Sequence, residues 1–169
     1  MYGEGIQAKY LYLIDNPLAH GGDFVATTCV SGFTPEERFQ QAGLIVYNDD
    51  DYLKFGYEYN WPKEGGQTFC ILTETDAKSD FHYLDSENSG LKRYWVRIAK
   101  RGNHYEYLTS TDGKSFQSHG EVEWGDGSPK HIGILAKNGG NKEASELDAN
   151  FEFFELRAPA PERTVPGTR

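Results

Sequence analysis

The stretch QAGLIVYNDDDYLKFGYEY, residues 41–59, places two runs rich in β-branched and aromatic residues on either side of Asn48–Asp51. Residues of these types favour β-strands. Asn and Asp side chains hydrogen-bond their own neighbouring backbone and therefore favour tight turns. We expect strands over Ala42–Tyr47 and Tyr52–Trp61, with a turn between them.

The second of these strands alternates between two kinds of side chain. Its odd positions from Leu53 to Trp61 are apolar, whereas its even positions include Lys54 and Glu58. Successive side chains of a strand point to opposite faces of the sheet. We therefore predict that the odd positions pack against a second sheet and that Lys54 and Glu58 lie on a solvated face.

The rest of the chain repeats this pattern of short strands and turns. Closely spaced strands with no helix between them favour antiparallel pairing in a sandwich or a barrel. A capping pattern at Thr34–Glu37 leaves room for two turns of helix at most. The strands that we expect are Ala8–Ile14, Asp23–Phe33, Ala42–Tyr47, Tyr52–Trp61, Thr68–Glu74, Tyr94–Arg101, Tyr105–Ser110, Glu121–Trp124, His131–Lys137 and Asn150–Arg157.

The length and charge of the chain exclude several classes of function. Its 169 residues suit one domain. With 26 acidic and 17 basic residues the chain carries a formal charge of −9, so its surface would repel a nucleic acid. No apolar run approaches the ~20 residues of a membrane span. The N-terminus lacks the basic start and apolar stretch of a signal peptide, and an extracellular or periplasmic location would suit the chain as part of a larger protein.

The two cysteines, Cys29 and Cys70, stand among apolar and β-branched residues. A free thiol in such surroundings behaves as a small apolar side chain, which is the interpretation that we favour. A disulfide between them and a reactive thiol are the alternatives. The chain has no CxxC motif and no Cys/His spacing of a zinc site.

The composition changes after Arg157. Residues 158–169 are rich in Pro and Ala and show no periodicity, so we interpret them as a linker or a disordered tail. The predicted organisation is one β-sandwich over residues 1–157 followed by this tail. A linker would imply a neighbouring domain, whereas a plain terminus would not.

Four segments together resemble the concanavalin A-like lectin/glucanase superfamily. They are residues 41–59, 94–103 and 107–116, and the pair 131–138 with 149–154. Within that superfamily they are similar to the domain that follows the catalytic domain of β-xylosidases and to the DUF1349 proteins. The resemblance covers residues 23–157 and implies a two-sheet antiparallel jelly roll. It also implies an accessory module of a carbohydrate-active protein, although the polar region 60–89 departs from the β-xylosidase pattern.

A sugar site on such a module needs an aromatic plate and polar groups beside it. The plate stacks on the apolar face of a pyranose, and the polar groups bind its hydroxyls. Arg97 and Trp95 share a face opposite Val96 and Ile98, so we expect Glu58 and Arg97 to pair if their strands are neighbours. The predicted ligand is an oligo- or polysaccharide, and the predicted binding residues are Lys54, Glu58, Trp95, Arg97 and Trp61.

Two alternatives to a non-catalytic sugar-binding module remain open. The first is a glycoside hydrolase of the glucanase type, for which the sequence offers only Glu121 and Glu123, ~7 Å apart on one face of a strand. The glucanase signature Glu-x-Asp-x-Glu is missing. The second alternative is a structural module that packs against a linked catalytic domain.

Acidic side chains offer one candidate metal site. Asp49 and Asp51 supply carboxylate oxygens, which calcium prefers, and Asp148 precedes the last expected strand. No Gly and no bidentate Glu follow at the spacing of an EF-hand loop. Turn formation is the competing interpretation of the aspartate cluster.

Overall fold

The chain forms a two-sheet antiparallel β-sandwich in a computed structural model that describes residues 10–18, 21–59, 66–84, 89–139 and 144–159. These residues include eleven strands and no helix. The strands are β1 (Tyr10–Asp15), β2 (Phe24–Ser31), β3 (Gln40–Asn48), β4 (Asp51–Tyr59), β5 (Gln67–Thr75), β6 (Lys78–Tyr83), β7 (Arg93–Arg101), β8 (His104–Ser110), β9 (Gln117–Glu123), β10 (His131–Asn138) and β11 (Asn150–Arg157).

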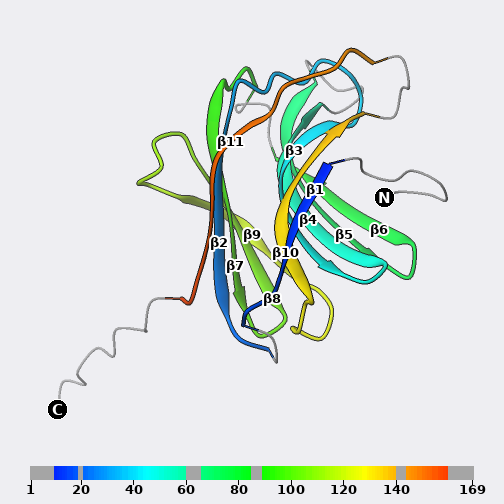
Figure 1. Ribbon diagram of the computed structural model, residues 1–169, viewed down its shortest axis with the longest axis vertical. Coiled ribbons are helices and arrows are strands. Elements are labelled where there is room, and N and C mark those ends of the chain that lie inside the picture. The colour runs from blue at the N-terminus through cyan, green and yellow to red at the C-terminus, as the bar shows by residue number, and fades with distance from the viewer. Residues whose placement is uncertain (1–9, 19–20, 60–65, 85–88, 140–143, 160–169) are drawn as a thin grey trace.

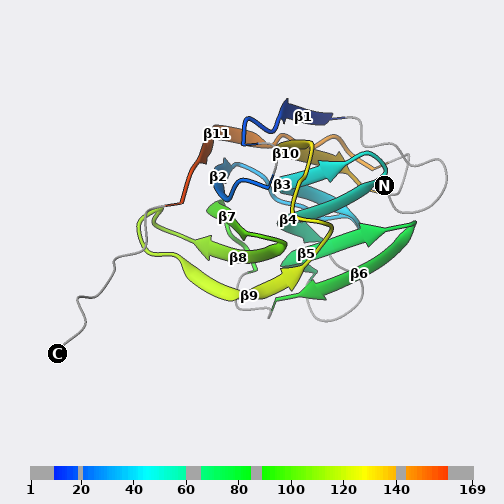
Figure 2. The same cartoon turned by 90° about the horizontal axis from the view of Figure 1, so that it is seen from below.

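The two sheets are assembled from strands that are distant in sequence. The six-stranded sheet has the order β1-β10-β3-β4-β5-β6, and the five-stranded sheet has the order β11-β2-β7-β8-β9. Every neighbouring pair is antiparallel, as the sequence predicts. Figures 1 and 2 show the sheets as two facing layers.

The main core lies between these layers and contains the apolar row of β4. Leu53, Phe55 and Tyr57 are fully buried, which confirms the predicted inward face. The Tyr57 ring lies 5.0 Å from the ring of Tyr94 on β7, centroid to centroid, so the aromatic side chains of the two sheets touch. Burial of each such side chain contributes about 1.5–3 kcal/mol to folding.

Two elements differ from the sequence-based expectation. The capping pattern at Thr34–Glu37 starts no helix, and the side-chain oxygen of Gln40 accepts the backbone N–H groups of Glu36 and Glu37 at 2.8 and 2.9 Å. So short a helix is marginal without strong packing. The strand β6 was not expected; it is polar and forms the edge of its sheet beside β5.

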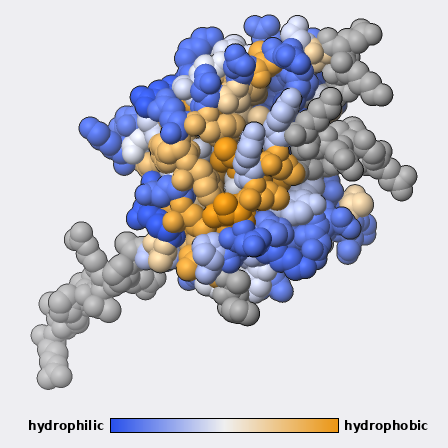
Figure 3. Space-filling model, viewed as in Figure 1, coloured by the Kyte–Doolittle hydropathy of each residue, from blue (hydrophilic) through white to orange (hydrophobic). Residues whose placement is uncertain are grey.

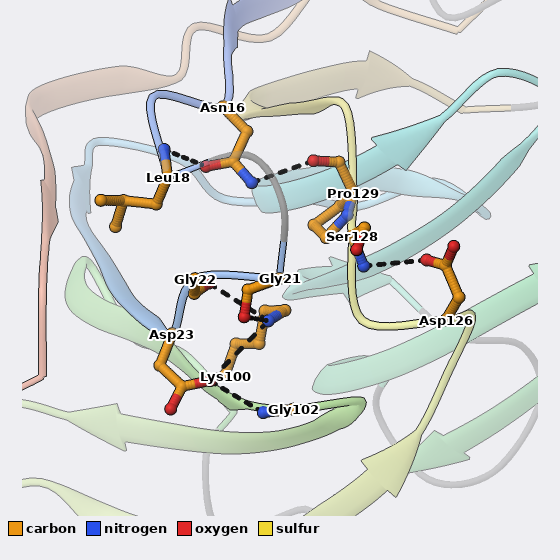
Figure 4. A network of polar contacts seen from close by, with 10 residues as sticks. All are labelled: Asn16, Leu18, Gly21, Gly22, Asp23, Lys100, Gly102, Asp126, Ser128 and Pro129. Carbon is orange, nitrogen blue, oxygen red and sulfur yellow. Dashed lines mark hydrogen bonds and ion pairs between the residues drawn. The ribbon is translucent and has the colours of Figure 1, made fainter.

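A buried ammonium group connects the loops at one end of the sandwich (Figure 4). Lys100 on β7 has no exposed surface, and its Nζ donates to the carbonyl oxygens of Gly21 and Gly22 at 3.3 and 3.2 Å. The carboxylate of Asp23 lies 3.8 Å away and accepts the backbone N–H of Gly102. A second link is made by the Asn16 side chain, which donates to the Pro129 carbonyl oxygen and accepts the backbone N–H of Leu18. The first set of bonds holds residues 21–23 against β7 and the β7–β8 turn, and the second holds Asn16 against the β9–β10 loop.

The two cysteines are free and buried, as the favoured interpretation predicts. Cys70 lies on the outer face of the six-stranded sheet, in the apolar cluster with Ile45 and Leu72. Cys29 neighbours Trp95 in the five-stranded sheet, on the face opposite to the core residues Val30 and Val96. The two thiols therefore face away from each other across the sandwich.

The last strand ends at Arg157, and only residues 158 and 159 of the predicted tail are described. Within the described ranges no helix has the length and apolar character needed to cross a membrane.

Candidate functional site

The even positions of β4 face outward from the six-stranded sheet, as predicted, but they are not solvated. Lys54 and Glu58 are only 9% and 3% exposed. Lys54 stands across from Ile45 on β3 and Leu72 on β5, which belong to a small apolar cluster on this face. The outer face thus carries a second, partly apolar layer that encloses the charged pair.

The charged pair is held by neutral hydrogen-bonding groups. Lys54 Nζ lies 3.8 Å from Glu58 Oε2 and donates to the side-chain oxygen of Gln41. The hydroxyl of Tyr83 on β6 hydrogen-bonds the same glutamate. Burial raises the pKa of Glu58, and the charge of Lys54 opposes that shift. Burial and the nearby Glu58 charge also raise the pKa of Tyr83, which keeps its hydroxyl protonated.

An open cavity of about 140 Å³ lies above this pair. Gly43 and Gly56 face each other between the Gln41–Glu58 and Ile45–Lys54 cross-strand pairs and add no side chain there. The volume is below the ~300–1,000 Å³ typical of sites for drug-sized ligands, so it fits one small chemical group. The cavity is lined by Arg38, Phe39, Gln41, Tyr52, Lys54, Glu58, Leu72, Phe81, Tyr83 and Lys137.

Phe39 forms one wall of the cavity in an unusual backbone conformation. Its φ is +67°, a left-handed value that costs a non-glycine residue about 1–3 kcal/mol. Its backbone N–H donates to the Tyr59 carbonyl at 3.1 Å, and its own carbonyl accepts from the Gln41 side chain at 3.2 Å. The guanidinium carbon of Arg38 and the ammonium of Lys137 lie 4.7 and 5.5 Å from the centre of the Phe39 ring.

The expected pair between Glu58 and Arg97 does not form. Arg97 lies on β7, between β2 and β8 in the five-stranded sheet, whereas β4 lies between β3 and β5 in the other sheet. Both side chains point away from the core, so they lie on opposite sides of the molecule. Arg97 Nε instead donates to Thr27 Oγ1 at 3.0 Å, and its guanidinium lies 3.5 Å from the centre of the Phe116 ring.

The expected exposure of Trp95 is also wrong, because the side chain is only 8% exposed. The guanidinium of Arg93 covers its ring at 4.6 Å. The β8–β9 loop approaches it so closely that a Cβ at Gly113 would lie 2.8 Å from the indole. Trp61 lies outside the described residues. Binding of a ligand by Trp95, Arg97 or Trp61 therefore stays a prediction.

Of the residues that line the cavity, only Lys54 and Glu58 were predicted from the sequence as binding residues. The other eight were not predicted, namely Arg38, Phe39, Gln41, Tyr52, Leu72, Phe81, Tyr83 and Lys137. Lys137 stands two residues after the buried Leu135 on β10, so the period of two of a strand could have placed both side chains on the same face. Arg38 and Phe39 lie in the turn before β3, where no periodicity indicates the direction of a side chain.

The structure does not bring the three predicted metal ligands together. Asp49 pairs with Lys130, and the Asp51 carboxylate accepts the backbone N–H of Asp76 at 2.9 Å. Both aspartates lie at the β3–β4 turn, whereas Asp148 lines a cavity beside Asn138, which pairs with the other end of β3. Within the described ranges no three His, Cys, Asp or Glu side chains form a metal-binding group. These residues do not fit a shared calcium site.

The glutamates of the hydrolase alternative lie on an edge strand. Glu121 and Glu123 on β9 are 64% and 69% exposed at their side chains. They stand 3.6 and 3.8 Å from the ring nitrogens of His104, on the five-stranded sheet. Exposure on this scale leaves both carboxylates in water, without the burial that sets apart a catalytic acid.

A second cavity, of about 370 Å³, opens between the two sheets where β1 and β10 approach β11. Its wall includes Tyr10 and Tyr12, which are 55% and 69% exposed, and the partly buried Leu147 and Phe151. Figure 3 shows apolar side chains gathered between the layers on this side of the molecule. We refer to this feature as the open-edge groove.

The sheet order and the antiparallel pairing define a jelly-roll β-sandwich of the concanavalin A-like class. The chain belongs to a family described as "Protein of unknown function (DUF1349)", whose model matches residues 14–159. No curated protein matches the chain.

Solved structures with the same fold come from several kinds of protein. The GH43 protein BlXynB of Bacillus licheniformis has a TM-score of 0.71 at 20% identity, with 90% of this chain covered. This chain spans only 30% of that protein's length. A functionally unknown protein of Saccharomyces cerevisiae has a TM-score of 0.65 at 20% identity, over 89% of this chain and 74% of that one. A tetrameric galectin of the ball sponge Cinachyrella has a TM-score of 0.60 at 12% identity, over 87% of this chain and 99% of that one.

Proposed function

We propose that the protein is a non-catalytic carbohydrate-binding module that binds sugar at the cavity above Lys54 and Glu58. The observation that carries this proposal is a charged pair buried on the outer face of a sheet, outside the main core. An apolar pair of similar volume is often at least as stable as a buried ion pair. Folding alone therefore gives no reason for charges at this position, whereas ligand recognition does.

The wall of the cavity combines the two kinds of contact that a sugar ring requires. Phe81 is 49% exposed and packs edge-on against Tyr83, with ring centres 5.3 Å apart. Such an exposed aromatic side chain can stack on the C–H face of a pyranose. Gln41, Glu58 and Tyr83 supply acceptors and donors for hydroxyl groups. A single open site of this size suits micromolar to millimolar affinity.

The comparisons support a sugar-related role through the names of the proteins that share the fold. One neighbour is named a xylan β-1,4-xylosidase and another a galectin. Their identity to this chain is 15% and 12%, so the likeness shows only a shared fold, and the ligand has to be identified by experiment. We also propose that this module is linked to a catalytic domain.

A glycan array, followed by titration of the best ligand, tests the proposal. Phe81→Ala should weaken binding about five- to thirtyfold, because one stacked aromatic contributes about 1–2 kcal/mol. The matched control is Phe153→Ala, since Phe153 on β11 is also exposed, at 41%, but lies on the other sheet. Equal binding by both variants, or no binding to any glycan, would overturn the proposal. A parallel series with a chelator measures whether binding needs a metal ion.

The open-edge groove supports a second candidate function, a module that packs against a neighbouring domain. Tyr10, Tyr12 and Ile14 on the edge strand β1 are 45–69% exposed, and large apolar side chains gathered at an edge are typical of interfaces. Tyr12→Ser should weaken such packing and leave glycan titrations unchanged. Loss of glycan binding in Tyr12→Ser with intact folding would contradict this division between the two surfaces.

A further inference from the structure

The walls of the cavity on the six-stranded sheet carry an excess of positive charge. Arg38, Lys54 and Lys137 line the cavity, and Glu58 is the one carboxylate among the described lining residues. The whole chain, by contrast, has a formal charge of −9. The local charge is therefore opposite in sign to that of the protein.

Lys54 and Glu58 carry opposite charges, so Arg38 and Lys137 make the net charge of the described lining residues positive. Lys54 lies 3.8 Å from Glu58 and also donates to Gln41. Arg38 and Lys137 form no ion pair with a carboxylate in the part of the chain that the structure describes, and both are held against the ring of Phe39. Two positive groups thus flank one point of the cavity wall.

The surroundings of Lys137 disfavour its positive charge. Burial, and secondly the positive charge of Lys54, lower the pKa of Lys137, and Glu58 only partly offsets them. A bound anion would remove this repulsion between the cations. Both cations contact the same ring, that of Phe39, which brings a guanidinium and an ammonium group to one wall of the cavity.

From these contacts we propose that the bound sugar is acidic, and that Arg38 and Lys137 hold its carboxylate or sulfate group in the cavity. This inference rests on the proposed function and names its ligand class. The small volume of the cavity suits one such group, while the sugar ring that carries it lies outside against Phe81. Guanidinium and ammonium groups bind oxyanions through charge-assisted hydrogen bonds, which are stronger than bonds between neutral groups.

Binding of short oligogalacturonides, compared with the fully methyl-esterified oligomers, tests this inference, because the ester removes the charge and keeps the sugar. We expect the acid to bind at least tenfold more tightly than the ester, in line with one or two charge-assisted bonds. The acid should also lose affinity as NaCl is raised, whereas the ester should not. A sulfated galactan oligomer and its desulfated form make the corresponding pair for sulfate, and the pair with the larger ratio identifies the anion.

Charge-removing variants locate the contact. Arg38→Gln and Lys137→Gln should each reduce the preference for acid over ester about tenfold. The control is Lys114→Gln, which removes an exposed charge from the β8–β9 loop of the other sheet and should leave the preference unchanged. Equal reduction by all three variants would indicate a general charge effect and overturn the inference.

The outcomes separate this inference from the proposed function. If acid and ester bind equally and Phe81→Ala weakens both, the site binds sugar and the acidic class is wrong. If no saccharide of either pair binds and the array is also blank, the proposed function itself fails. Binding of the acid that persists in Arg38→Gln combined with Lys137→Gln would refute the assignment of these two side chains.

Discussion

Replacement of Lys54 by Met leaves the carboxylate of Glu58 buried without its partner, and this variant probes the site most directly. Glu58 is 3% exposed and lies 3.8 Å from the ammonium group. At an effective dielectric constant of about 20, that distance corresponds to an attraction of roughly 4 kcal/mol. Removal of one member of a buried pair typically costs 3–5 kcal/mol.

Protonation of Glu58 limits this cost and makes it depend on pH. Keeping the Glu58 carboxyl protonated costs about 1.4 kcal/mol for each pH unit above the ordinary glutamate pKa of about 4.3. The destabilisation caused by loss of Lys54 is therefore limited to about 1 kcal/mol at pH 5 and to nearly 4 kcal/mol at pH 7. Burial already raises the pKa of Glu58, and loss of Lys54 raises it further, although Lys137 and the Tyr83 hydroxyl still face the carboxylate. A raised pKa means that stability is lost as pH rises through it.

Urea unfolding between pH 5 and pH 8 measures this effect. We expect Lys54→Met to lower the free energy of unfolding by about 3 kcal/mol at pH 7 and by about 1 kcal/mol at pH 5. The double variant Lys54→Met with Glu58→Gln serves as the control, because it removes both charges and should recover most of the loss at pH 7. A loss below 1 kcal/mol at pH 7, with the same pH dependence as the unaltered protein, would refute the reasoning.

Three further predictions concern other parts of the fold. Lys100→Met should lower the free energy of unfolding by about 2–3 kcal/mol, because two carbonyl oxygens lose a charged donor; a loss no larger than in Lys114→Met would contradict this. Gly43→Ala should cost at least about 2 kcal/mol in thermal unfolding, because its Cβ would lie 2.3 Å from the Phe55 carbonyl oxygen. Gly90→Ala, which meets no atom within 4 Å, should cost only the ~1 kcal/mol of a left-handed backbone, and equal losses would refute the steric argument. Cys29 and Cys70 should react with Ellman's reagent only on unfolding, since both are buried and burial raises their pKa; rapid reaction of either thiol in the folded protein would show that its cover opens.

The alternation of residues along single strands was enough to predict much of the fold. Leu53 and Phe55 pack in the core, while Lys54 and Glu58 face the other way, as a period of two requires. Ten of the eleven strands overlap a strand expected from the sequence, although β9 begins at Gln117, before the expected start at Glu121. The exception is β6, whose polar sequence follows from its place at the edge of the sheet, where one side needs no partner strand.

The candidate site could be predicted only in part, because its other members come from outside β4. Gln41 and Lys137 reach the cavity through strand pairing, and Tyr83 does so from the edge strand. The turn that carries Arg38 and Phe39 has a positive φ at Phe39 and a side-chain hydrogen bond from Gln41, and neither feature produces a periodic pattern in the sequence.

What the order of residues determined by itself is the face on which each side chain of a strand stands, because that depends only on the geometry of an extended backbone. Which strand becomes its neighbour was decided by tertiary structure alone. Arg97 has the same local pattern as Glu58, yet β7 joins the five-stranded sheet, and the two charges end on opposite sides of the core. Strand pairing depends on contacts between distant segments, and a short-range pattern carries no information about them.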